Sequence, residues 1–272
     1  MTNASDWQGK VGQNWADMHA WTDRSFTGLT QHLLGRIAEH AGRAVLDIGC
    51  GAGELSLAIA RARHDANVIG LDISPDLAAA AQARGGQHPN LEFVVGNAAT
   101  WQRESFTPDL LVSRHGVMFF DEPPATFAHL RGIAAPGAPL VFSCFRSVRE
   151  NRWMSDLARL LDLPPPTDPY APGPFAFADP QRVEGILAAA GWTGIDFEPV
   201  DFAYIAGTGA DPVADAEAFF ARIGPAAATL RELRGAALEQ AQQRIRAWLA
   251  ERSTGDLVAF SAAAWVVTAR NG

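Results

Sequence analysis

Cysteine and lysine are nearly absent from this sequence of 272 residues. Its two cysteines are Cys50 and Cys144, and Lys10 is the only lysine among the 22 lysines and arginines. Two cysteines give neither a disulfide framework nor a cysteine-based metal site, and the histidines form no ligand motif, so no bound metal is expected. A single lysine also makes Schiff-base catalysis an unpromising mechanism.

Long apolar runs are absent too. No stretch of about 18 or more apolar residues occurs, so no membrane-spanning helix is predicted. Residues 1–6 lack the basic and apolar regions of a signal peptide, and we therefore expect a cytoplasmic protein. The net charge of −8 argues against a nucleic-acid partner, because phosphate backbones repel an acidic surface. The length suits one domain with an elaboration.

The most informative stretch, 45–53, reads VLDIGCGAG. Three glycines at alternate positions (Gly49, Gly51 and Gly53) allow a tight turn and a close approach of ligand to the main chain. A second apolar run, 67–72, ends in Asp72, and a carboxylate there can accept hydrogen bonds from both hydroxyls of a ribose. A helix cap before Ser74 is the alternative role for Asp72.

The glycine spacing and the acids around it separate two classes of nucleoside ligand. A dinucleotide site uses G-x-G-x-x-G, whereas this loop has G-x-G-x-G. Asp47 precedes the loop and Glu54 follows it, and both would repel a pyrophosphate at the helix N-terminus. Two acids suit a ligand with an amino or sulfonium cation better.

In these features the sequence resembles the class I (Rossmann-fold) S-adenosylmethionine (SAM) dependent methyltransferases, in particular the small-molecule enzymes of ubiquinone and menaquinone biosynthesis. The likeness extends over most of the chain, but specific motifs occur only in residues 44–145. It implies an α/β fold with a doubly wound, mostly parallel seven-stranded sheet, N-terminal helices and a helical cap inserted late in the chain. It also implies SAM as cofactor and S-adenosylhomocysteine (SAH) as product.

The pattern of apolar runs, glycines and prolines predicts the organisation of the chain. We expect an N-terminal helical lid at 1–43, a SAM-binding core at 44–150, a Pro-rich cap segment at 151–178, and the rest of the core at 179–272 with a helical insertion at about 211–251. Strands are expected at 44–48, 67–72, 91–95, 110–113, 139–144, 193–205 and 257–269. Helices are expected at 54–63, 75–84, 123–134, 180–190 and 211–222, with one long helix at 226–251.

The resemblance assigns cofactor contacts residue by residue. The methionine end of SAM would meet Asp47, Gly49, Cys50, Gly51 and Gly53. Asp72 would hold the ribose, while Ile73 and Ala98 would lie at the adenine. Asn97, where many relatives carry an aspartate, could accept from the adenine amino group or serve only as a turn residue. Ser113 and Arg114, at the end of the fourth strand, are further candidates for cofactor binding.

His115 follows that strand, in the segment that passes between cofactor and acceptor in such folds. It is a candidate general base for the acceptor, or else a residue that shapes the turn. In the N-terminal segment Gln8, Trp15, Met18 and His19 are weaker site candidates, and the alternative role for the tryptophans there is to pack these helices onto the sheet. Acceptor-pocket walls are expected among apolar, aromatic and basic residues of the later chain, which are otherwise core: Phe145, Arg146, Trp153, Met154, Phe175, Phe177, Phe219, Phe220 and Ile223.

The sequence therefore predicts transfer of a methyl group from SAM to a hydrophobic or aromatic small molecule. No Asn/Asp-Pro-Pro-aromatic tetrad follows the fourth strand, which favours methylation of oxygen or carbon over nitrogen. A non-catalytic SAM-binding partner protein is the alternative, and an NAD-dependent dehydrogenase is a third, disfavoured reading.

Overall fold

The main sheet runs in the order β3-β2-β1-β4-β5-β8-β6 in the computed structural model, which describes residues 4–164, 167–224 and 226–272. Its strands are β1 Ala44–Ile48, β2 Asn67–Asp72, β3 Leu91–Val95, β4 Leu110–Arg114, β5 Pro139–Phe145, β6 Trp192–Thr208 and β8 Leu257–Asn271. Only β8 is antiparallel to its neighbours on this path, and the two-residue β7 (Ser253–Thr254) pairs with it. The predicted fold class, a mostly parallel α/β sheet, is confirmed.

The centre of the sheet is apolar because both of its faces are covered. In β1, Val45, Leu46 and Ile48 are fully buried, and parallel ladders join this strand to β2 and β4. Chain order reverses at β1, since β2 lies on one side of it and β4 on the other. Ligands of such sheets bind beyond the carboxyl ends of the strands at this switch point.

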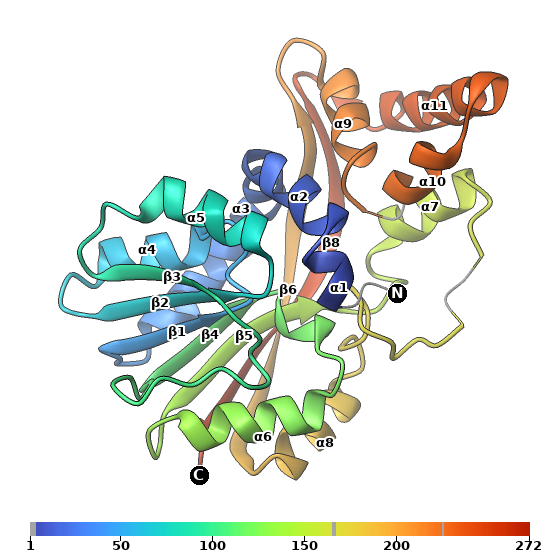
Figure 1. The fold of residues 1–272 in the computed structure, drawn as a ribbon. Helices are drawn as coiled ribbons and strands as arrows, with labels where there is room; N and C mark the ends of the chain where they lie inside the picture. Colours follow the sequence, from blue (N-terminus) through green and yellow to red (C-terminus); the bar gives the residue numbers. More distant parts are fainter. Residues whose placement is uncertain (1–3, 165–166, 225) are drawn as a thin grey trace.

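Helices cover both faces of the sheet (Figure 1). One face carries α3 (His19–Ala38), α4 (Glu54–Ala62) and α5 (Pro75–Gly85), and the other carries α6 (Pro123–Ile133) and α8 (Pro180–Ala189). Local sequence explains their starts: the Ser74 hydroxyl accepts from the Leu77 N–H at α5, and the Asp179 carboxylate accepts from the Gln181 N–H at α8. Two further N-terminal helices, α1 (Ala4–Trp7) and α2 (Lys10–Asp17), precede α3.

Strands β6 and β8 continue together past the end of β5, where Asp201–Thr208 still pairs with Leu257–Ala263. This two-stranded arm carries a helical cap on one side of the molecule (Figure 1). The cap consists of α9 (Pro212–Phe220), α10 (Ala226–Glu232) and α11 (Gly235–Ala250). The expectation of one helix over 226–251 was wrong: the chain breaks before Gly235, whose φ of +55° is not helical.

The chain between β5 and α8 is mostly irregular. It begins with a helix that the sequence did not predict, α7 (Arg152–Leu160). Earlier in the chain, a 3-10 turn (η1, Val117–Phe119) follows β4. The Pro-rich stretch then runs without helix or strand to α8, as its prolines require; Pro165 and Pro166 of the predicted cap segment lie outside the described residues. Within the described ranges, no helix has the length and hydropathy needed to cross a membrane.

Candidate functional site

The loop after β1 is held against the end of β2 by its own main chain. The N–H groups of Gly49 and Cys50 both donate to the Leu71 carbonyl, at 2.8 and 3.0 Å. Gly51 has a φ of +55°, and the space where its Cβ would lie is open. A side chain there would fill the cavity described below, so this glycine leaves room for a ligand to approach the main chain.

Asp72 receives main-chain hydrogen bonds on both carboxylate oxygens. Gly51 N–H donates to Oδ2 at 2.8 Å and Ser74 N–H donates to Oδ1 at 2.9 Å. The residue therefore supports the loop and the start of α5, and it also lines the cavity. Burial raises the pKa of its carboxyl. Each carboxylate oxygen still has lone-pair capacity for a ligand hydroxyl.

Asp47 is fully buried at the end of β1. Its Oδ2 accepts a 2.5 Å hydrogen bond from the Ser56 hydroxyl, whereas its buried Oδ1 has no partner. Burial raises the pKa of this carboxyl to about 7. A buried acid with a free oxygen at a cavity wall is suited to pair with a cationic ligand group.

Asp47 is consequently a source of instability when it is charged. Its folded pKa lies above the ordinary value of 3.8, so the folded state binds the extra proton and loses stability as pH rises from about 4 to about 7. Asp47→Asn keeps an oxygen for Ser56 and carries no charge. Without ligand, we expect it to be more stable than the wild type by about 4 kcal/mol at pH 8, and by much less at pH 4.5.

Thermal melts of both proteins across pH 4.5–8 measure this difference. Asp65→Asn is the matched control, because Asp65 is an exposed carboxylate outside the cavity. An Asp47→Asn protein no more stable than the wild type at pH 8 would contradict a charge cost at this position.

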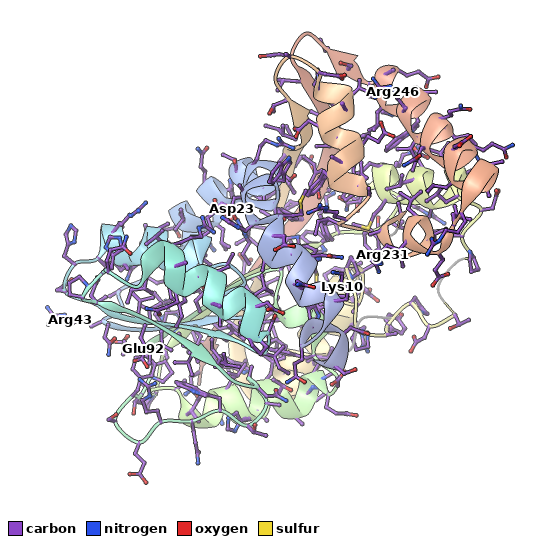
Figure 2. All side chains as sticks on the ribbon, turned by 45° about the horizontal axis from the view of Figure 1, so that its top comes forward. Lys10, Asp23, Arg43, Glu92, Arg231 and Arg246 are labelled. Carbon is purple, nitrogen blue, oxygen red and sulfur yellow. The ribbon has the colours of Figure 1, made fainter. Side chains whose placement is uncertain are left out.

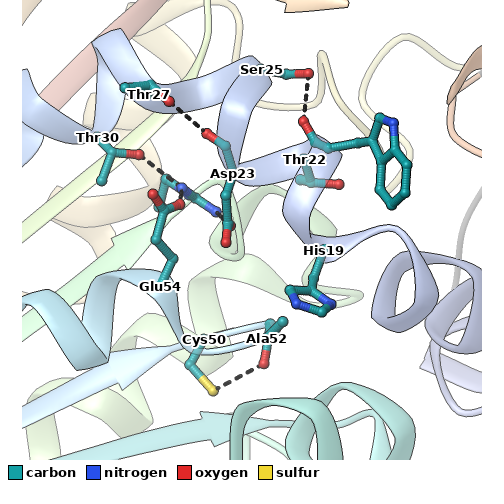
Figure 3. Close-up of polar contacts among 12 residues, drawn as sticks. His19, Thr22, Asp23, Ser25, Thr27, Thr30, Cys50, Ala52 and Glu54 are labelled. Carbon is teal, nitrogen blue, oxygen red and sulfur yellow. Dashed lines mark hydrogen bonds and ion pairs between the residues drawn. The ribbon is translucent and has the colours of Figure 1, made fainter. Parts of the chain in front are cut away.

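Arg114 ends β4 and contacts three oxygen-bearing side chains, which Figure 3 labels: Asp23, Thr30 and Glu54. Its Nη1 donates to the Thr30 hydroxyl at 2.8 Å and to the Glu54 carboxylate, and its Nη2 lies 3.4 Å from the Asp23 carboxylate. Asp23 also pairs with Arg84, at 2.7 Å. This network links the N-terminal helix α3 to the glycine loop.

Glu54 is thus neutralised by Arg114, and it does not act as the free acid that the argument against a pyrophosphate assumed. Glycine spacing and Asp47 carry that argument alone. The guanidinium of Arg114 is likewise occupied by protein oxygens, so a cofactor contact from this residue remains a prediction.

His115 has an unusual backbone and a buried ring. Its φ of +61° is uncommon for a non-glycine residue, and strained geometry of this kind gathers at functional sites. Nδ1 lies 2.8 Å from the Ser143 hydroxyl, while buried Nε2 has no partner. Burial and then Arg114 lower the pKa of the ring to about 3. The imidazole is therefore neutral at physiological pH.

A cavity of about 1370 Å³ joins these groups. Ten of the twelve predicted site residues line it: Asp47, Gly49, Cys50, Gly51, Asp72, Ile73, Asn97, Ala98, Arg114 and His115. Gly53 does not line it but precedes α4 as its N-cap, where a Cβ would meet Phe93 at 2.7 Å. Ser113 does not line it either, because its hydroxyl donates to the Ile48 carbonyl at 2.6 Å.

Asn97 shows the turn geometry that was its alternative role. Its Oδ1 accepts from the Ala99 N–H at 2.9 Å, and the residue also lines the cavity next to Ala98. The amide NH₂ and the second lone pair of the oxygen stay available, so an adenine contact remains compatible with the turn.

Beyond His115 the cavity wall becomes aromatic. Among the predicted wall residues Phe145, Trp153, Met154, Phe175 and Ile223 line the cavity, and Arg146, Phe177, Phe219 and Phe220 do not. Trp15 and His19 line it from the N-terminal helices, whereas Met18 is buried without lining it. Figure 3 labels His19 of α3 and the glycine loop residues Cys50 and Ala52, all of which line the cavity.

Several lining residues were missed by sequence reasoning. They come from the N-terminal helices, from β6 and from the cap: Asn14, Thr22, Asp23, Tyr204, Arg222 and Arg231. No local motif marks them, since only the tertiary fold brings these segments to the switch point. Among the described residues, no group of three or more His, Cys, Asp or Glu side chains is arranged to hold a metal ion.

Comparison with known proteins places the motif region in one family. Residues 45–137 match the family described as "Methyltransferase domain". Trans-aconitate 2-methyltransferase of Methylobacterium radiotolerans is 38% identical over 108 residues, covering 40% of each chain. Malonyl-[acyl-carrier protein] O-methyltransferase of Halalkalibacterium halodurans is 33% identical over 113 residues, covering 40% of this chain and 42% of that protein. The match thus spans about two fifths of the length of these relatives.

Solved structures share the whole fold at low identity. The [4+2]-cyclase SpnF superposes with a TM-score of 0.58 at 16% identity, covering 98% of this chain and 96% of its own. At that identity the likeness concerns the fold alone, and the chemistry has to be argued from the site.

Proposed function

We propose that this protein is a class I SAM-dependent methyltransferase that transfers the methyl group of SAM to an oxygen or carbon of a hydrophobic or aromatic small molecule, and the match of residues 45–137 to a methyltransferase domain supports this proposal. The observation that carries the proposal is one continuous cavity with a polar end at the glycine loop and an aromatic end beyond His115. Ligand pockets commonly measure about 300–1,000 Å³. A volume of about 1370 Å³ is therefore sufficient for a cofactor and an acceptor together.

The residues at the polar end fit SAM. The free buried Oδ1 of Asp47 is suited to its ammonium group. Asp72 is suited to its ribose hydroxyls, and the open space over Gly51 to the chain between them. Ile73, Asn97 and Ala98 line the same end and are suited to adenine.

When bound, SAM supplies an activated methyl group, so the protein need only align the acceptor with it and exclude water. His115 stands at the junction of the two ends of the cavity, with Nε2 free. A ring with a pKa of about 3 is a poor proton acceptor near neutral pH. We therefore assign it the role of hydrogen-bonding the acceptor, in preference to that of a general base. The N-terminal helices close the cavity through Trp7, whose ring packs 5.0 Å from Phe119.

Titration calorimetry with SAM, SAH and NADH tests this function. We expect micromolar binding of SAM and SAH and none of NADH. Because a ligand cation at Asp47 favours the charged carboxylate, binding near pH 6.5 should release a proton, seen as a buffer-dependent heat. Binding of NADH without SAM would contradict the proposal. SAM binding without methyl transfer to a panel of phenols, quinols and apolar acids would favour a non-catalytic SAM-binding protein.

A further inference from the structure

The far end of the cavity holds two arginines without acid partners. Arg222 follows α9 and Arg231 lies on α10, and both line the cavity. From these residues we infer that the acceptor is an apolar acid whose anionic group binds Arg222 and Arg231, at the end remote from the methylated atom. The inference rests on the proposed function and names the substrate class for the same site.

The other arginines of the cavity wall are neutralised. Arg114 is paired with Glu54 and Asp23, and Arg159 lies 3.0 Å from Asp156. By contrast, no ion pair joins Arg222 or Arg231 to a carboxylate within the described chain. The Nη1 of Arg222 approaches the Sδ of Met18 at 3.9 Å.

No acid from the cap offsets these two charges at the cavity. The other residues of the turn and helix that line it are uncharged: Ile223, Gly224, Ala227 and Ala228. Figure 2 shows Arg231 on the side of the cap turned toward the N-terminal helices. In a chain with a net charge of −8, two arginines that line one cavity and have no carboxylate partner in the described chain are suited to an anion from outside the protein.

An aromatic path connects this end to the reaction centre. The His115 and Phe145 rings are 4.3 Å apart, and Phe145 is 6.4 Å from Trp153. Trp153 stacks on Tyr204 at 4.3 Å and approaches Phe220, two residues before Arg222, at 6.0 Å. Phe220 belongs to the core and does not line the cavity, so the apolar body of the ligand would lie against Phe145, Trp153 and Tyr204, with its reactive atom at His115 and its charge at the arginines.

The acids that line the cavity do not cancel the positive charge of Arg222 and Arg231 at the cap end. Asp47, Asp72 and Asp23 lie at the cofactor end. The remaining acids of the cavity wall belong to α1, to the start of α6 and to the start of α8, and none of them comes from the cap: Asp6, Asp121, Glu122 and Asp179. The cavity is therefore suited to a cation at the glycine loop and to an anion at the cap.

A matched pair of fluorescent probes tests the anion site without any activity assay. 8-Anilinonaphthalene-1-sulfonate carries a sulfonate, and N-phenyl-1-naphthylamine has the same ring system without it. Both are titrated into SAH-saturated wild type, into the double variant Arg222→Gln/Arg231→Gln, and into Arg244→Gln. Arg244 is an exposed arginine of α11 that does not line the cavity.

We expect the double variant to bind the sulfonate about tenfold or more weakly, since charge-assisted contacts are lost. Binding of the uncharged probe and of SAH should stay within about twofold, and Arg244→Gln should match the wild type. Unchanged sulfonate binding in the double variant, or an equal loss for both probes, would overturn the inference.

Competition identifies the anion and separates this inference from the proposed function. Decanoate or decyl phosphate should displace the sulfonate probe better than decanol, and the stronger of the two distinguishes a carboxylate from a phosphate. Equal displacement by decanol would contradict an anion site. Failure of wild-type protein to bind SAH in calorimetry would instead reject the proposed function, whatever the probes show.

Discussion

Asp72→Ala is expected to weaken SAH binding by about 100-fold or more. The change removes a buried acceptor for the ribose hydroxyls, and hydrogen bonds to a charged group contribute about 1.5–3 kcal/mol each. It also frees the Gly51 N–H from its 2.8 Å bond, so the glycine loop loses one of its ties to β2. Together these losses exceed the roughly 1.4 kcal/mol that corresponds to one tenfold step in affinity.

The fold should survive this change. Asp72 is a buried carboxylate whose pKa is raised by burial, so removing it also removes the cost of burying its charge. Circular dichroism and a thermal melt check that the variant is folded, and calorimetry measures its SAH affinity. Asp76→Ala is the control, because Asp76 is exposed in the first turn of α5, the helix that follows Asp72. An unchanged affinity in folded Asp72→Ala would exclude this residue from the site.

Local sequence signals predicted the parts of the fold that local physics determines. Strands β1, β2 and β3 begin and end at the predicted residues, because each is a short apolar run bounded by polar or turn residues. The Ser74 and Asp179 caps give the starts of α5 and α8. The break at Gly235 was missed because an isolated glycine is compatible with a helix, and here the chain places it at φ +55°.

The sequence predicted the residues at the cofactor end of the cavity but not the arginines at its cap end. At the cofactor end, glycines and acids follow directly from strand ends, so the motif and the switch point coincide. The pairing of Glu54 with Arg114 could not be predicted from the sequence, since 60 residues separate the two partners. The place of the cap arginines at the cavity could not be predicted either, because only the arm formed by β6 and β8 brings them there.

His115 is predicted to act on turnover and not on cofactor affinity. His115→Ala should lower kcat by about 100-fold, within the range for loss of a group that contacts the reacting centre, while SAH affinity changes less than threefold. His115→Asn tolerates the positive φ but is too short to place a polar atom at Nε2, so it should resemble alanine. His115→Gln extends an amide toward that position and should recover part of the rate.

The pH profile distinguishes hydrogen bonding from proton abstraction at this residue. Burial and Arg114 keep the pKa of His115 near 3, so its protonation state does not change between pH 5 and pH 8. The plot of kcat against pH should therefore show no inflection near pH 6.5 that is present in the wild type and absent in His115→Gln. A general base would instead give such an inflection, and glutamine, which cannot accept the proton, would be as slow as alanine. Steady-state rates of the wild type and the three variants across this range, with SAH affinity as the check on folding, decide between the two roles.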